Sequence, residues 1–229
     1  MNVIPQAVKD GFVRLTGPLV KALVRGRVRP NTITTIGALV VIGSAVAYGM
    51  SAVRLGGLLL LLSGLFDILD GQVARQGGKM SAFGAFYDSS LDRVGESALF
   101  AGLALHFLWG GLPAGQVTLG VMLAMAALSA SLMVSYTRAR AEGLGIECKV
   151  GIAARAERIL VLGAPTLFFG AGPGGRLLLW IMAILALATA ITVVQRIVHV
   201  AGVAAGSPTA RSTRRRDTQP GHASLRKGT

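Results

Sequence analysis

Four aspartates lie close together in an otherwise apolar chain, at Asp67, Asp70, Asp88 and Asp92. Only 10 of the 229 residues are acidic, and 52% are hydrophobic. An unpaired carboxylate is costly to bury, so acids inside apolar segments usually pair with a cation, bind metal or take part in chemistry. We therefore expect a functional site in this stretch.

The spacing of the aspartates places them in two pairs. Residues three or four positions apart share one face of a helix, so Asp67 pairs with Asp70, and Asp88 with Asp92. If the two helices pack together, the four carboxylates repel one another strongly, and hard divalent cations relieve that repulsion. Asp88 and Asp92 differ by about 6 Å along a helix, which suits two metals roughly 4 Å apart. We expect two Mg²⁺ ions that polarise phosphate, with Mn²⁺ as an alternative.

Small and basic residues accompany the aspartates. Gly71 directly follows an aspartate and leaves space for a ligand against the backbone. Ala74 lies on the same helix face and keeps the opening clear, and Arg75 can bind phosphate through two hydrogen bonds. Close packing of membrane helices is the competing account for Gly71 and Gly84. Their spacing to the acids favours function.

The composition indicates an integral membrane protein. The mean hydropathy is +0.62, and the chain has repeated apolar runs of roughly 20 residues, the length of a membrane-spanning helix. The net charge of +13 does not indicate a nucleic-acid partner, because the basic residues flank the apolar runs and no DNA- or RNA-reading motif occurs. We expect an all-α integral membrane fold with six transmembrane helices plus an N-terminal amphipathic juxtamembrane helix.

The apolar runs place the expected elements. Residues 4–29 have apolar positions at helical spacing, with Lys and Arg elsewhere on the turn, which suggests a helix on an anionic membrane surface; packing on the spans is the alternative. The six expected spans are residues 33–52, 55–74, 83–109, 112–136, 153–170 and 177–200. The chain then divides into a cytoplasmic juxtamembrane segment (1–30), a six-helix domain (31–205) and a disordered basic tail (206–229).

The distribution of Lys and Arg predicts the orientation. With six spans, 21 of the 23 basic residues fall on one side, and only Arg54 and Arg176 fall on the other. Since short cytoplasmic segments carry the basic excess, we expect a multi-pass protein of the cell (inner) membrane with both termini and the aspartates at the cytoplasmic side. A membrane cation carrier is the rival of another class. Its charges would be expected near the bilayer midplane, often with repeat symmetry.

The full pattern, D-x-x-D-G-x-x-A-R-x8-G-x-x-x-D-x-x-x-D, resembles the signature of the CDP-alcohol phosphotransferase family. The resemblance covers about residues 30–200 and includes a Pro-Asn-x-x-Thr start, here Pro30, Asn31 and Thr34. It implies a six-helix integral enzyme that moves a substituted phosphoryl group from a CDP-linked alcohol to an acceptor hydroxyl and releases CMP.

The resemblance also implies a role for each matched position. The metal ligands would be Asp67, Asp70 and Asp88. The acceptor hydroxyl would be activated by Asp92, which would also contact the second metal. The CDP-lipid would be bound by Asn31, Thr34, Gly71, Ala74, Arg75 and Gly84.

Basic residues further along the chain suggest the acceptor. Arg196 lies inside the last apolar run, and a buried arginine in a span needs an anion. A cluster that also contains Arg138 and Arg158 suits a phosphorylated acceptor. The alternative for Arg138 is the basic flank of a span. For Arg155 and Arg158 it is pairing with Glu157 or with aspartates.

This downstream region is similar to the prokaryotic branch of the family that makes phosphatidylinositol phosphate. The matches are Ser135 to Glu142, Arg155 to Arg158, and Gln195 with Arg196, whereas Ala156 replaces a proline of that branch. The resemblance implies CDP-diacylglycerol as donor, inositol phosphate as acceptor and a homodimer. It implies acceptor-phosphate binding by Ser135, Arg138, Arg155, Arg158 and Arg196. Glycerol phosphate, giving phosphatidylglycerophosphate, is the alternative acceptor.

Overall fold

Seven α-helices account for most of residues 6–206, which are the residues described by this computed structural model; side chains are described from residue 16 to residue 205. The helices are α1 (Gln6–Arg25), α2 (Pro30–Gly49), α3 (Val53–Gln76), α4 (Ala82–His106), α5 (Val117–Gly143), α6 (Arg155–Phe169) and α7 (Arg176–Gly206). Short π and 3₁₀ turns follow α4 and precede α7. This part of the chain contains no strand, so the all-α prediction is confirmed.

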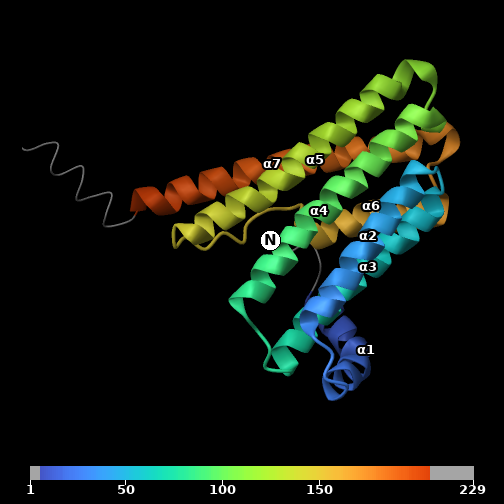
Figure 1. The fold of residues 1–229 in the computed structure, drawn as a ribbon. Helices are drawn as coiled ribbons and strands as arrows, with labels where there is room; N and C mark the ends of the chain where they lie inside the picture. Colours follow the sequence, from blue (N-terminus) through green and yellow to red (C-terminus); the bar gives the residue numbers. More distant parts are fainter. Residues whose placement is uncertain (1–5, 207–229) are drawn as a thin grey trace, which may run out of the picture.

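Helix α2 joins the two helices that carry the aspartates. It packs extensively against both α3 and α4, while α3 and α4 have little direct contact with each other. Helix α6 lies on α3, and α5 packs along α7, which gives the elongated arrangement in Figure 1. The aspartates of α3 and α4 are therefore brought together through α2 and not by direct packing of the two acidic helices.

Glycines allow two of these helix contacts to be very close. A Cβ on Gly57 of α3 would lie 2.5 Å from Thr166 Oγ1 and 2.7 Å from the backbone nitrogen of Leu167, both on α6. A Cβ on Gly102 of α4 would overlap the carbonyl of Ala45 on α2. Small residues at helix contacts are common in membrane proteins. These contacts fix how α3 sits against α6 and how α4 sits against α2.

The main apolar core occupies the half of the bundle that contains the α2–α3 connection. Its largest fully buried members include Tyr48, Leu60, Leu103, Phe107 and Leu162. The Tyr48 hydroxyl is within 2.7 Å of a hydroxyl on α6, so the one polar end of this ring is satisfied inside the core. The aspartates of α3 and α4 lie beyond this core, toward the opposite end of the bundle.

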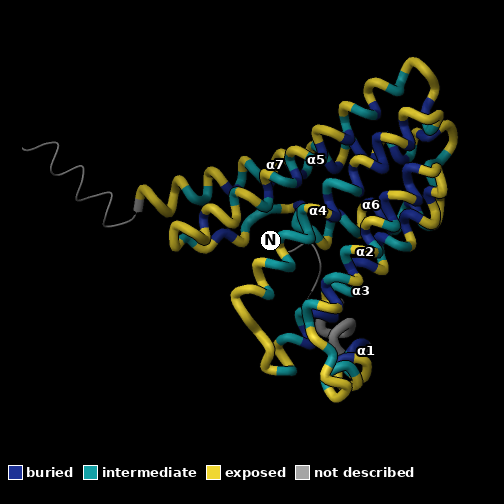
Figure 2. Tube along the Cα trace, viewed as in Figure 1, coloured by how far each residue is buried: buried dark blue, intermediate teal, exposed yellow. Residues whose placement is uncertain are grey.

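The outward faces of the long helices are apolar. Trp180 and Leu187 on α7 are 68% and 65% exposed, and Met122 on α5 is 65% exposed. Figure 2 shows exposed positions recurring along the outer sides of α5 and α7. A large exposed apolar surface indicates contact with a membrane or a partner.

Within the described residues, three segments are long and apolar enough to cross a membrane: Pro30–Gly49, Ala114–Gly143 and Pro173–Ala205. Together with the exposed apolar faces, they indicate a membrane protein. Helix α6, where a fifth span is expected, has only 15 residues. The number of six spans therefore stays a prediction.

Helix α1 packs against the aspartate-bearing helix α3. Val20 is fully buried against Leu69 and Val73, and the Gln72 Nε2 donates a hydrogen bond of 3.1 Å to the Thr16 hydroxyl. Packing on the bundle, the alternative for this segment, is thus observed, and contact with a membrane surface stays a prediction. Residues 1–5 of the expected juxtamembrane segment, and the expected tail from residue 207 onward, lie outside the described residues.

Candidate active site and metal centre

Three aspartates from two helices converge on one point. Asp67 and Asp70 on α3 and Asp88 on α4 each offer a carboxylate oxygen, and the three oxygens lie within 4.8 Å of one another. Asp70 is buried, and the other two are half-buried. A group made only of carboxylate oxygens fits a hard divalent cation. The cluster can therefore hold a divalent metal.

The connection between α3 and α4 turns the chain so that these acids face one another. Gly78 has a φ of 62°, in the left-handed region that glycine adopts readily. Ser81 then caps α4, because its Oγ accepts a hydrogen bond of 3.0 Å from the backbone N–H of Gly84. The reversal places Asp88 opposite the last turns of α3.

A threonine on α2 contacts the metal cluster directly. The Thr34 hydroxyl donates a hydrogen bond of 2.7 Å to Oδ2 of Asp70 and lies 3.2 Å from the backbone carbonyl of Pro30. Thr34 is predicted to bind the donor, and the structure places its hydroxyl on a carboxylate of the cluster. It therefore orients a candidate metal ligand as well as facing the neighbouring cleft.

Asp92 lies outside the group of three. Its carboxylate forms an ion pair with Arg155 of α6, and Arg93 Nη2 lies 3.5 Å from its Oδ2. Arg155 Nη1 also donates a hydrogen bond of 3.1 Å to Oδ1 of Asp67. Pairing with aspartates is the alternative left open for Arg155, and this contact is present in the structure. Arg155 thus joins the metal cluster to the residue predicted to be the base.

One cleft is lined by every residue predicted to bind the donor: Asn31, Thr34, Gly71, Ala74, Arg75 and Gly84. Asp70 and Asp88 line the same cleft. A Cβ on Gly71 would lie 3.4 Å from the guanidinium nitrogens of Arg75, so the arginine folds over this glycine. The cleft combines small residues, an arginine and two acids of the metal cluster.

The same cleft is also lined by a lysine that the sequence motifs do not identify. Lys79 lines it, and its Nζ donates hydrogen bonds to the backbone carbonyls of Arg27 and Val28, at 3.4 and 3.3 Å. These contacts tie the α3–α4 connection to the turn between α1 and α2. A basic residue in the short segment between two acidic helices is the signal that could have found it.

The predicted acceptor residues lie around the ends of α5, α6 and α7, and each has a partner within the protein. Arg158 pairs with Glu96, and Arg138 Nε lies 2.8 Å from a Glu142 oxygen. Arg196 donates from Nε to a backbone carbonyl at 3.0 Å, and the Ser135 hydroxyl donates to a carbonyl of its own helix at 3.3 Å. Arg196 of α7 also donates to the backbone carbonyl of Val134, one turn before Arg138 on α5, so these two arginines lie in one region.

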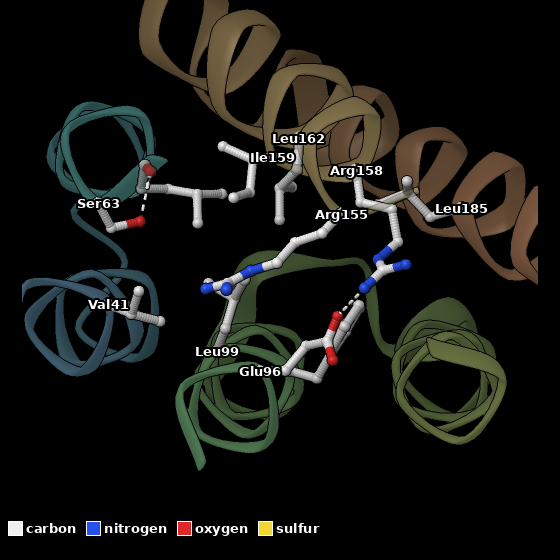
Figure 3. Close-up of a pocket in the computed structure, with 11 residues that line it drawn as sticks. Val41, Ser63, Glu96, Leu99, Arg155, Arg158, Ile159, Leu162 and Leu185 are labelled. Atoms are coloured by element: carbon white, nitrogen blue, oxygen red, sulfur yellow. Dashed lines mark hydrogen bonds and ion pairs between the residues drawn. The ribbon is translucent and has the colours of Figure 1, made fainter. Parts of the chain in front are cut away.

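Arg155 and Arg158 line a second pocket, which lies between α3, α4 and α6. Figure 3 shows Arg155 and Arg158 extending from α6 toward Leu99 and Glu96 on α4, across this small pocket between the helices. Ser63 of α3 lines the pocket from the other side. Arg155 therefore faces both this pocket and the acid cluster.

Comparison with known proteins gives a consistent result. A family model described as CDP-alcohol phosphatidyltransferase matches residues 27–204. Phosphatidylinositol phosphate synthase of Cutibacterium acnes is 38% identical over 200 residues, which cover 84% of this chain and 95% of that protein. Archaetidylinositol phosphate synthase of Methanothermobacter thermautotrophicus is 41% identical over 172 residues, with 73% and 80% covered.

The fold is similar to crystal structures of Mycobacterium tuberculosis phosphatidylinositol phosphate synthase. The structure with CDP-DAG bound has a TM-score of 0.72 and 31% identity, covering 86% of this chain and 96% of that chain. The structure in complex with manganese and citrate has a TM-score of 0.71 and 30% identity, with 85% and 91% covered. That complex and the cluster of three aspartates together indicate a divalent-metal site in this chain.

Proposed function

The chain belongs to the CDP-alcohol phosphatidyltransferase family, and we propose that it transfers a phosphatidyl group from CDP-diacylglycerol to a hydroxyl of inositol phosphate. The products are phosphatidylinositol phosphate and CMP, so the protein is a transferase of phospholipid biosynthesis. One observation carries the proposal: the six predicted donor residues line a single cleft together with two aspartates of the metal cluster. Membership of an enzyme family replaces the cation-carrier hypothesis.

The proposed metal ligands are Asp67, Asp70 and Asp88, whose oxygens form the cluster. We propose two Mg²⁺ ions, with Mn²⁺ as the alternative, and Asp92 as a further contact to the second ion. When bound, such ions neutralise charge on the donor diphosphate and so favour attack at phosphorus. Thr34 keeps the Asp70 carboxylate oriented through its 2.7 Å hydrogen bond.

The remaining residues of the cleft bind the donor. Gly71 leaves the backbone open beneath the Arg75 guanidinium, which is free to bind diphosphate oxygens in a forked geometry. Ala74 and Gly84 keep that side of the cleft open, and Asn31 lines it beside Gly84. The lipid chains of the donor can remain in the bilayer while the nucleotide occupies the cleft.

Asp92 is the proposed general base. It takes the proton of the acceptor hydroxyl while the hydroxyl oxygen bonds to the phosphorus that carries the lipid. The bond from that phosphorus to the CMP oxygen breaks, and CMP leaves with the electron pair. Arg155 holds the Asp92 carboxylate toward Asp67, which keeps the base beside the metal cluster.

The proposed acceptor site contains Arg138, Arg155, Arg158, Arg196 and Ser135. The buried Arg158 and Arg196 favour a phosphorylated acceptor over a neutral one, since buried cations attract an anion. The relatives named for inositol phosphate products favour inositol phosphate over glycerol phosphate. Glycerol phosphate remains the alternative acceptor to test.

We also propose how the protein sits in the membrane. Helices α2 to α7 would form six spans of the cell (inner) membrane, with α1 at the cytoplasmic surface and both termini cytoplasmic, because that arrangement puts the basic excess on one side. The site then opens to the cytoplasm, where inositol phosphate arrives and CMP departs. The functional unit would be a homodimer.

The test is CMP release from CDP-diacylglycerol by the purified protein in detergent with Mg²⁺. Inositol phosphate, glycerol phosphate, free inositol and serine are compared as acceptors. We expect release with inositol phosphate and little with the two unphosphorylated acceptors. Release with glycerol phosphate alone would select the alternative acceptor, and release with only an uncharged acceptor would contradict the arginine site.

A further inference from the structure

Six charged side chains of alternating sign form a continuous chain of ion pairs across the site. It runs through Asp67, Arg155, Asp92, Arg93, Glu96 and Arg158. All five links are ion pairs, and the members come from α3, α4 and α6. The chain connects an aspartate of the metal cluster to a buried arginine of the proposed acceptor site.

Glu96 and Arg158 form the most deeply buried link of this chain. Their side chains are 7% and 6% exposed, and Figure 3 shows the two groups meeting between α4 and α6. The same pocket is lined by apolar side chains such as Leu99, Leu162 and Leu185. A buried charge in such surroundings needs a partner, and among the ion pairs of the described residues Glu96 is the acid that contacts Arg158.

The contacts of Arg158 leave part of its guanidinium available. One Nη donates to Glu96, and the other donates to the backbone carbonyl of Ala153 at 3.0 Å. A guanidinium has five N–H donors, so donors remain for an anion. These two partners therefore fix the orientation of the Arg158 guanidinium and leave some of its N–H donors unpaired.

Glu96 also reaches toward the proposed base. Arg93 Nε lies 3.4 Å from Oε2 of Glu96, and its Nη2 lies 3.5 Å from Oδ2 of Asp92. Glu96 therefore contacts Arg158 directly, and it is linked to Asp92 through Arg93. It is not part of the aspartate pattern, although it lies one helical turn beyond Asp92 on the same face.

We propose that Glu96 is a positioning residue of the transfer reaction: its buried carboxylate fixes Arg158 for the acceptor phosphate and couples that site to the base through Arg93. This inference rests on the proposed function, because it assigns Glu96 to the acceptor side of that reaction. The simpler account is that the pair only holds α4 to α6. The two accounts differ in which kinetic constant changes.

The experiment uses the purified full chain and measures CMP release while inositol phosphate and CDP-diacylglycerol are varied separately. In Glu96→Gln the amide keeps the shape but removes the charge. We expect the KM for inositol phosphate to rise about 10- to 100-fold, the size expected for losing a hydrogen bond to a charged group. The KM for CDP-diacylglycerol is expected to stay within about twofold, since Glu96 does not line the donor cleft.

A double-mutant cycle separates positioning from simple helix pairing. If Glu96 acts through Arg158, then Glu96→Gln adds little to the KM for inositol phosphate once Arg158→Gln is present. Glu96→Asp keeps the charge and is expected to restore part of the affinity. The matched control is Glu147→Gln, which removes an exposed acid paired with the exposed Lys149, and its KM values are expected to equal those of the wild type.

Three results would overturn the inference. The first is that Glu96→Gln and Arg158→Gln have independent effects on the KM for inositol phosphate. The others are an equal rise in KM for inositol phosphate and CDP-diacylglycerol, or an unchanged KM for inositol phosphate, in Glu96→Gln. If Glu96→Gln does not fold, Glu96→Asp decides alone, and an unchanged KM for inositol phosphate in that variant rejects the inference. Failure of the proposed function is distinct, because the wild-type protein itself would then release no CMP with inositol phosphate.

Discussion

The hydroxyl of Thr34 donates a 2.7 Å hydrogen bond to Oδ2 of Asp70, which joins α2 to the candidate metal ligands of α3. Helix α2 carries no acid of its own, yet it packs against both acidic helices. Partners that orient metal ligands are often as important to a metal site as the ligands themselves. This bond therefore gives a direct test of the metal site that leaves every carboxylate in place.

Thr34→Val is expected to raise the metal concentration needed for half-maximal activity by about 10-fold or more, because the Asp70 carboxylate loses the donor that orients it. The measurement is CMP release as a function of added Mg²⁺. The control is Thr137→Val on α5, where the half-buried hydroxyl donates to carbonyls of its own helix, away from the aspartates. An Mg²⁺ dependence equal to that of the wild type in Thr34→Val would contradict this role.

Asp92→Asn is expected to abolish turnover, with a loss of about 10²- to 10⁴-fold, because the amide cannot accept the proton of the acceptor hydroxyl. Binding of CDP-diacylglycerol should be largely retained, since Asp92 does not line the donor cleft. The two quantities are measured as single-turnover CMP release and as equilibrium binding of the donor. Near-normal turnover in a folded, purified variant would rule out the base assignment.

Ala74→Leu is expected to raise the KM for CDP-diacylglycerol by about 10-fold, because the larger side chain fills part of the donor cleft at a cost of about 1–3 kcal/mol. The KM for inositol phosphate should change little. Ala101→Leu, at an exposed position of α4, is the matched control. If the Ala74 variant bound the donor as the wild type does, the cleft would not be the donor site.

Gly57→Ala is expected to destabilise the fold by about 1–3 kcal/mol, because its Cβ has no space against α6. A Cβ at Gly57 would lie 2.5 Å from Thr166 Oγ1, whereas one at Gly143 would meet nothing within 4 Å. Gly143→Ala is therefore the matched control. Thermal unfolding in detergent measures both variants, and equal midpoints would show that α3 and α6 do not need this close contact.

The order and type of the helices could be predicted from the sequence, because apolar runs and their interruptions mark them. The first expected span begins at residue 33, whereas α2 begins at Pro30, since proline's fixed φ suits the first position of a helix. The third expected span ends at residue 109, but α4 ends at His106 and a π turn follows. Helix ends depend on local backbone geometry that apolar periodicity does not contain.

The grouping of Asp67, Asp70 and Asp88 could also be predicted, because helical spacing puts acids on one face. The acid that each arginine contacts could not be predicted from the sequence. Arg155 contacts Asp67, which lies 88 positions earlier in the chain, and Arg158 contacts Glu96, 62 positions earlier. Which opposite charges meet depends on how α6 lies across α3 and α4, and that geometry follows from close contacts such as the one at Gly57.

The main apolar core and the aspartates occupy different halves of the bundle. The core half is held by interlocking apolar side chains, while the carboxylates themselves are held by a hydrogen bond from Thr34 and by ion pairs of Arg155, beside a smaller apolar cluster that includes Val20, Leu69 and Val73. Polar contacts of this kind weaken with ionic strength and with water entry sooner than apolar packing does. Gentle heating or harsh detergent would therefore inactivate the enzyme while its helical signal is still intact, so helical content alone is a poor guide to whether a preparation is active.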